Sequence, residues 1–207
     1  LLPFFGISLL WWASVLLVIT APGGTIALFR ATDPFTAPDP EQSLSRRWIA
    51  SVRQNLVRGW IVAFAFGIPA LVLISNIARY SSSGSRFGVF TLLWMALLLL
   101  VLAAGGIACS LLATRNVPVG QALKMAVGLT LAHCLPILPG LVLLWLFVAL
   151  GGMLVIPAVM FVPPTVALTF NYLVALMLGE DLPDPLEPTA EREAELAATQ
   201  PGPYSTN

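Results

Sequence analysis

The chain has 207 residues, of which 58% are hydrophobic and 10% charged, and its ten basic and ten acidic residues give a formal net charge of zero. A soluble domain carries about 25% charged residues, so the composition excludes an ordinary water-soluble protein. Apolar runs long enough to cross roughly 30 Å of hydrocarbon recur along the chain. We therefore predict an all-α, polytopic membrane helix bundle with about five transmembrane helices and a cytoplasmic, interfacial amphipathic helix.

The predicted elements divide the chain into a membrane part and a tail. A transmembrane helical domain is expected over residues 1–179, with an acidic, proline-rich and disordered tail over 180–207. The first span has no positively charged segment before it and no A-x-A cleavage site after it, so we expect it to be retained. The predicted spans are about 4–21, 59–79, 87–113, 122–148 and 153–178.

The stretch "TAPGGTIALF" at 20–29 contains three potential helix breakers, Pro22, Gly23 and Gly24. We expect a kink here, where the first span ends, with residues 25–30 running on as a short helical turn. The stretch lacks the lysine that a phosphate-binding loop requires. Alternatively, a half-helix terminus here offers backbone N–H groups to a ligand. A similar stretch, "PPTVALTF", contains Pro163 and Pro164, and transporters often place such broken helices in corresponding halves of a repeat.

An amphipathic helix is predicted at about 40–58. Four bulky apolar residues recur there every four positions, while the arginines lie largely elsewhere on the helix. Such a helix lies in the inner membrane interface with its arginines facing anionic headgroups. The alternatives are a solvated basic connector and a surface for a partner protein. The predicted lipid or partner contacts are Arg46, Arg47, Trp48, Arg53 and Arg58.

Arginine and lysine set the predicted orientation of the chain. The loop after the first span holds five basic residues, and the connection between the third and fourth spans adds Arg115 and Lys124 on the same side. The opposite side has only Arg79 and Arg86. We therefore expect the N-terminus outside the cell and the C-terminus in the cytoplasm.

Chemistry inside a membrane usually requires ionisable residues in the spans. The predicted apolar cores contain no Asp, Glu, Lys or Arg, and the chain has no metalloprotease, serine-hydrolase, zinc-site or phosphate-loop motif. We therefore expect a protein that is not an enzyme, with no catalytic residue, no metal and no cofactor.

His133, the one histidine, lies in "LAHCLPILPG". Pro136 and Pro139 each remove a backbone donor and free the carbonyls of Ala132 and Leu135. This pattern is typical of a histidine at a helix kink with a local or interhelical hydrogen bond. A role as axial ligand to a haem or chlorin-type pigment is the alternative, and it makes His133 the candidate cofactor-binding residue.

The run "SLLWWASVLLVITAPGGTIALF", followed by "VRQNLVRGW", resembles the YesL-like family of small bacterial integral membrane proteins. The first matching element includes Thr20, Pro22 and Thr25, and the second includes Arg53 and Asn55. Ser8 stands where the family usually has asparagine, and one proline of the family pattern is absent. The resemblance covers roughly the first 60 residues specifically.

This resemblance implies a multi-span helical protein of undefined activity in the bacterial inner membrane. Relatives are often encoded beside carbohydrate-uptake and polysaccharide-degradation systems, which implies an accessory role in sugar transport. The resemblance supplies no catalytic residue, and we expect Arg53 and Asn55 to tie the interfacial helix to the bundle.

Three functions are consistent with these observations. The first is a non-enzymatic accessory or assembly subunit of a membrane complex, whose partners are membrane lipids and other integral membrane subunits, with no nucleic acid. The second is a small-solute or lipid transporter built on the broken helices, with a polar cavity lined by Thr25, Thr165, Asn171 and His133. The third is a structural subunit of an electron-transfer or photosynthetic complex.

Overall fold

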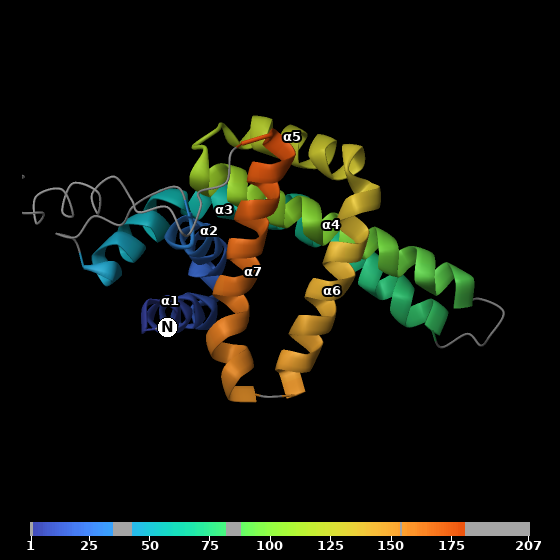
Figure 1. Cartoon of the computed structure of the whole chain (residues 1–207), viewed down its shortest axis with the longest axis horizontal. Coiled ribbons are helices and arrows are strands. Elements are labelled where there is room, and N and C mark those ends of the chain that lie inside the picture. The colour runs from blue at the N-terminus through green and yellow to red at the C-terminus, as the bar shows by residue number, and fades with distance from the viewer. Residues whose placement is uncertain (1, 35–42, 82–87, 154, 181–207) are drawn as a thin grey trace, which may run out of the picture.

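Helices make up all the secondary structure in the part of the chain that the computed structural model describes, which is residues 2–34, 43–81, 88–153 and 155–180. Figure 1 shows their arrangement. In chain order they are α1 (Leu2–Leu16), the short 3-10 helix η1 (Val18–Thr20), α2 (Ala21–Ala31), α3 (Leu44–Ser81), α4 (Gly88–Thr114), α5 (Val119–Ala132), α6 (Cys134–Met153) and α7 (Val155–Leu178).

Several of these helices have the length and composition of membrane spans. Three described helices qualify: Leu44–Ser81, Phe90–Thr114 and Met160–Leu178. The bent pair Phe5–Leu16 and Val18–Ala31 raises the number to four if it is taken as one span. The all-helical membrane class is therefore supported, whereas the predicted count of five spans is not confirmed.

The first predicted span, 4–21, is not a straight helix. The chain bends by 116° between Phe5–Leu16 and Val18–Ala31. At this bend the Thr20 hydroxyl donates a hydrogen bond to the Ser14 carbonyl at 2.8 Å. The break therefore lies upstream of Pro22, which occupies the first turn of α2. Proline is tolerated there because the first turn of a helix has no intrahelical partner for its N–H groups.

The predicted amphipathic helix and the second predicted span form a single helix, α3. It has 38 residues, which corresponds to about 57 Å at a rise of 1.5 Å per residue. This exceeds the roughly 30 Å hydrocarbon thickness of a bilayer. The predicted segment 40–58, of which residues 40–42 lie outside the described residues, and the predicted span 59–79 are therefore continuous in one helix that is longer than a bilayer is thick.

The later spans also differ from the sequence-based expectation. The predicted span 122–148 is divided at His133 into α5 and α6. By contrast, α7 continues as one helix through Pro163 and Pro164, so the structure differs from the break predicted there. The predicted span 87–113 corresponds closely to α4, Gly88–Thr114.

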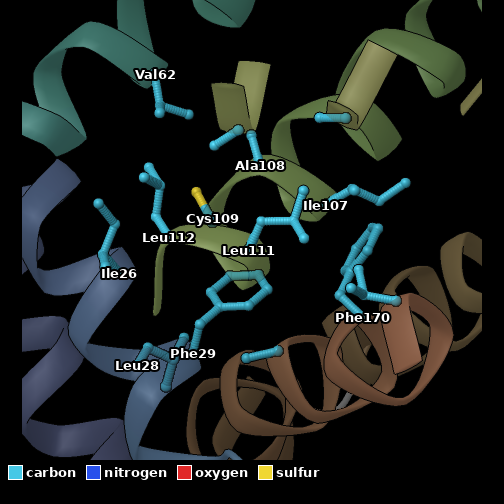
Figure 2. Close-up of a cluster of buried hydrophobic side chains, with 14 of the residues drawn as sticks. Ile26, Leu28, Phe29, Val62, Ile107, Ala108, Cys109, Leu111, Leu112 and Phe170 are labelled. Atoms are coloured by element: carbon cyan, nitrogen blue, oxygen red, sulfur yellow. The ribbon is translucent and has the colours of Figure 1, made fainter. Parts of the chain in front are cut away.

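The helices do not form one parallel bundle. In Figure 1 the α3–α4 pair runs across the picture, and the α6–α7 pair runs down it. The core lies where α2, α3, α4 and α7 meet, and Figure 2 shows Ile26 and Phe29 of α2 gathered there with Ile107 and Leu111 of α4 and Phe170 of α7. The α2 helix thus packs on its chain neighbours α1 and α3 and also on α4 and α7, which lie far from it in sequence.

Candidate functional site

Glycines allow α2 and α3 to cross at close range. A Cβ atom on Gly59 of α3 would lie 2.6 Å from both the carbonyl carbon and the carbonyl oxygen of Pro22. A Cβ atom on Gly23 would lie 2.9 Å from the carbonyl oxygen of Val52. The backbone of one helix therefore occupies the space beside the other. The Pro22–Gly23 stretch is a helix-packing site, and α3 fills the volume that a cradled ligand would need.

Gly24 allows a similarly close contact between α2 and α1. A Cβ atom on Gly24 would lie 2.5 Å from the Cβ of Ser14. The Ser14 hydroxyl donates to the Leu10 carbonyl at 2.9 Å and accepts a hydrogen bond from Trp48 Nε1 at 3.1 Å. Through Ser14, the bent α1–α2 unit is joined to the beginning of α3.

The apolar stripe of the predicted amphipathic helix faces the protein itself. Trp48 is only 5% exposed, so the prediction that it contacts lipid or a partner needs correction. Leu44 packs beside Gly6 of α1, with its Cδ2 at 3.3 Å from a Cβ built there, and Leu56 packs beside Gly23 of α2. Within the part of the chain that the structure describes, α1 and α2 cover this stripe, and the opposite face of the first half of α3 is exposed.

The predicted arginine contacts occupy different environments. Arg46 and Arg53 are exposed on the accessible face of α3, where they line a shallow groove of about 600 Å³ together with Ile49, Ala50 and Gln54.

The other two arginines lie on the flank of α3. Arg58 donates to Asn116 Oδ1 at 3.4 Å, and Arg47 is half-buried with no hydrogen-bond partner for its Nε among the described residues. The structure therefore separates the four arginines into an exposed pair, Arg46 and Arg53, and a flanking pair.

The residues of the family-like motif have local hydrogen bonds. Asn55 is buried and donates from Nδ2 to the Ser51 carbonyl at 3.0 Å. Thr25 donates to the Ala21 carbonyl at 2.9 Å and accepts from Trp11 Nε1 at 3.4 Å. With Thr20 at the bend and Arg53 exposed, the motif residues do not converge on one site.

A buried polar cluster, which we call the Asn171 cluster, joins three helices. Asn171 of α7 is 3% exposed, and its Nδ2 donates to the Phe29 carbonyl of α2 at 2.9 Å and lies 3.4 Å from Thr32 Oγ1. Its Oδ1 accepts from Ser110 Oγ of α4 at 2.7 Å. The last carbonyls of a helix have no intrahelical donor, so Asn171 supplies one to the end of α2.

A second tie links α1 to α7. Pro164 lacks an N–H group, which leaves the carbonyl of Met160 without its usual intrahelical donor. The hydroxyl of Ser8, which is fully buried, donates to this carbonyl. The structural roles of Ser8 and Ser110 were not predicted from the sequence. A hydroxyl group inside an apolar helix is the signal that marks both residues.

His133 marks the junction of α5 and α6. Its backbone N–H donates to the Leu129 carbonyl at 3.0 Å, and its Nδ1 lies 3.2 Å from the same oxygen. This geometry agrees with the local hydrogen bond expected of a histidine at a helix kink. Among the described residues, no group of three or more His, Cys, Asp or Glu side chains is placed to hold a metal ion.

Polar contacts join the C-terminal ends of α4 and α7 to a point inside α3. Arg115, just after α4, forms a two-point ion pair with Glu180, just after α7, and one of its hydrogen bonds, from Nε to Oε1, measures 3.0 Å. The neighbouring Asn116 accepts the hydrogen bond from Arg58 of α3. A point inside α3, the α4–α5 connection and the residue just after α7 therefore lie close together.

The second cavity described is apolar. It has a volume of about 310 Å³ and lies between α4, α6 and α7, where Phe170, Leu102 and Leu144 are among its lining residues. The four side chains predicted to line a polar transport cavity line neither this cavity nor the α3 groove. Thr165, for example, donates to the carbonyl of Phe161 in its own helix at 2.7 Å.

Comparisons with known proteins add no relative to this description. No family model matches the chain, and searches of the curated proteins and of the solved structures found no match. The contacts described above are therefore the basis for any statement about function.

Proposed function

We propose that the protein is a non-enzymatic integral membrane protein that acts as an accessory or assembly subunit of a membrane complex. The observation that supports this most is how its interior polar groups are used. Asn171, Ser8 and Trp48 each hydrogen-bond to a group on another helix, so the polar groups serve to hold helices together. Polar groups used for packing agree with a role outside catalysis.

Carbohydrate transport is the proposed setting of this complex. Its support is the resemblance of residues 8–60 to the YesL-like pattern, including Thr25 and Asn55. We place the protein in the bacterial inner membrane with its N-terminus outside, on the strength of the arginine and lysine distribution. The contacts of Arg58 with Asn116 and of Arg115 with Glu180 support a common side for the first loop and the start of the tail.

The two alternative functions receive less support. A transporter with broken helices at Pro22 and Pro163–Pro164 requires breaks at positions where α2 and α7 are continuous. Its proposed cavity residues are engaged in local or interhelical hydrogen bonds. A pigment-binding subunit relies on His133, and an absorbance spectrum of the purified chain tests it directly, since a bound haem or chlorin absorbs visible light.

Affinity purification from the native membrane tests the accessory function. The tagged full-length chain is extracted in mild detergent and, separately, in polymer-bounded native lipid discs, and the co-purifying proteins are quantified by mass spectrometry. An unrelated tagged polytopic protein at equal abundance is the control. We expect an integral transport component in stoichiometric amount in both preparations, and recovery of the chain when that component carries the tag. Recovery of the chain only as a free monomer would refute the proposed accessory function.

A further inference from the structure

The accessible face of α3 changes from charged to apolar along its length. Residues three and four positions apart share one face of a helix, and Arg46 and Arg53 lie on the same face as Val57, Ile61 and Phe64. The three apolar residues are 71%, 44% and 56% exposed. Before Arg53 this face also carries the exposed Ile49, between the two arginines. From Val57 onwards it is apolar.

The position of this change matches the edge of a bilayer. From Val57 to Ser81 the helix rises by about 36 Å at 1.5 Å per residue, which is enough to cross roughly 30 Å of hydrocarbon. Arg53 then lies about 6 Å beyond Val57 along the helix axis, within the depth of a headgroup layer, which is about 5–8 Å on each side. Arg46 lies about two turns farther out.

No carboxylate on α3 offsets the positive charge of this face. The helix contains no Asp or Glu over residues 44–81, and its first turn has no acidic residue. An anion placed at the groove that Arg46, Arg53 and Gln54 line therefore meets positive potential from the two guanidinium groups.

We propose that this face is a binding site for an anionic phospholipid. The headgroup phosphate lies at Arg53 and Gln54, an acyl chain follows Val57, Ile61 and Phe64, and Arg46 adds long-range attraction. Trp48 takes no part in the site, because it packs on α1. The inference depends on α3 crossing the membrane and is independent of the accessory function.

Lipid retention measured by native mass spectrometry tests the site. The full-length chain is reconstituted in an equal mixture of phosphatidylglycerol and phosphatidylcholine, and the ratio of the two lipids retained per protein is measured. An arginine near an anionic surface contributes about 1 kcal/mol, and 1.4 kcal/mol is a factor of ten. We therefore expect Arg53→Gln to lower the ratio about fivefold, and the double variant with Arg46→Gln to lower it further by a smaller factor, because Arg46 lies about a Debye length beyond Arg53.

A matched control removes the same charge elsewhere. The double variant Arg30→Gln and Lys124→Gln changes two exposed residues on α2 and α5 and is expected to keep the wild-type ratio. A ratio unchanged in the α3 double variant would overturn the proposal, and so would an equal loss in the control, since that would indicate bulk charge alone. Thermal unfolding of every variant establishes that each is folded.

The acidic C-terminal tail is the competing occupant. Six carboxylates lie between residues 181 and 195, outside the described residues. A full-length variant with these six changed to amides distinguishes the two occupants. An unchanged preference for phosphatidylglycerol supports the lipid site, whereas a preference that emerges only in this variant would show that the tail occupies the face and would overturn the proposal.

Discussion

Replacing Gly59 with alanine tests whether the α2–α3 crossing is as close as the structure has it. The new Cβ atom would lie 2.6 Å from the carbonyl carbon of Pro22 and 2.8 Å from the backbone nitrogen of Gly23. Both neighbours are backbone atoms of a helix that is itself packed on its other sides. The clash is therefore relieved only by moving α2 away from α3, rather than by rotating a side chain.

The size of the effect follows from a comparison with Gly67→Ala in the same helix. A Cβ atom on Gly67 meets nothing within 4 Å. Both substitutions gain helix propensity of up to about 1 kcal/mol, and this gain cancels when the two variants are compared. Overpacking of a well-packed contact costs about 1–3 kcal/mol. For a chain of this size, 1 kcal/mol corresponds to about 2–4 °C in Tm, so Gly59→Ala is expected to melt about 2–12 °C below Gly67→Ala.

Thermal unfolding of the two purified variants, in the same detergent and in lipid discs, measures this difference. Intrinsic tryptophan fluorescence is a suitable probe, because Trp48 and Trp60 lie on α3 on either side of the crossing. Wild-type protein sets the reference, and Gly67→Ala is expected to melt at or slightly above it. Equal melting temperatures for the two alanine variants would refute the close crossing and the packing role of Gly23 derived from it.

Three further predictions concern contacts between helices. Asn171→Leu removes the donor and the acceptor that link α7 to α2 and α4. Because interhelical hydrogen bonds in membranes are worth about 0.6–1.7 kcal/mol each, we expect a loss of about 1–3 kcal/mol in unfolding free energy. An unchanged free energy of unfolding would contradict the Asn171 cluster. Ser8→Ala should destabilise the wild-type chain, yet have little effect in a Pro164→Ala background, where the restored N–H donates to the Met160 carbonyl. A double-mutant cycle of melting temperatures measures this coupling, and additive effects would contradict the hydrogen bond from Ser8 to Met160. Glu180→Gln should cost at most about 1 kcal/mol, because its ion pair is partly exposed, and the cost should shrink as salt is raised; a salt-independent loss would point to another role.

Continuous apolar composition made several elements predictable. The predicted span 87–113 and helix α4, Gly88–Thr114, nearly coincide, because a long apolar run without strong breakers has few alternatives in a membrane. The exposure of Arg46 and Arg53 was also predictable, because a guanidinium group is costly to bury without a partner. Amphipathic periodicity alone also placed Trp48 opposite these arginines.

The bend and the partners of the buried polar groups were not predictable in this way. Local patterns assigned the break to Pro22, whereas the chain bends at Leu17, inside an uninterrupted apolar run. Local patterns also placed Asn171 in a predicted transport cavity, because its hydrogen-bond partner at the end of α2 lies far from it in the sequence. His133 was the exception, since the carbonyl that it contacts lies one turn away in the same segment.

The sequence by itself determined that this is a helical protein of membrane composition, and which residues on its first long amphipathic helix are charged. Only the tertiary structure decided what covers that helix: α1 and α2 fold back over its apolar stripe and leave its arginine face accessible. The physical reason is that hydropathy and periodicity report how each segment meets its solvent. Whether a helix face meets lipid, water or another helix depends on contacts such as that between Gly59 and Pro22, which form between residues far apart in the chain.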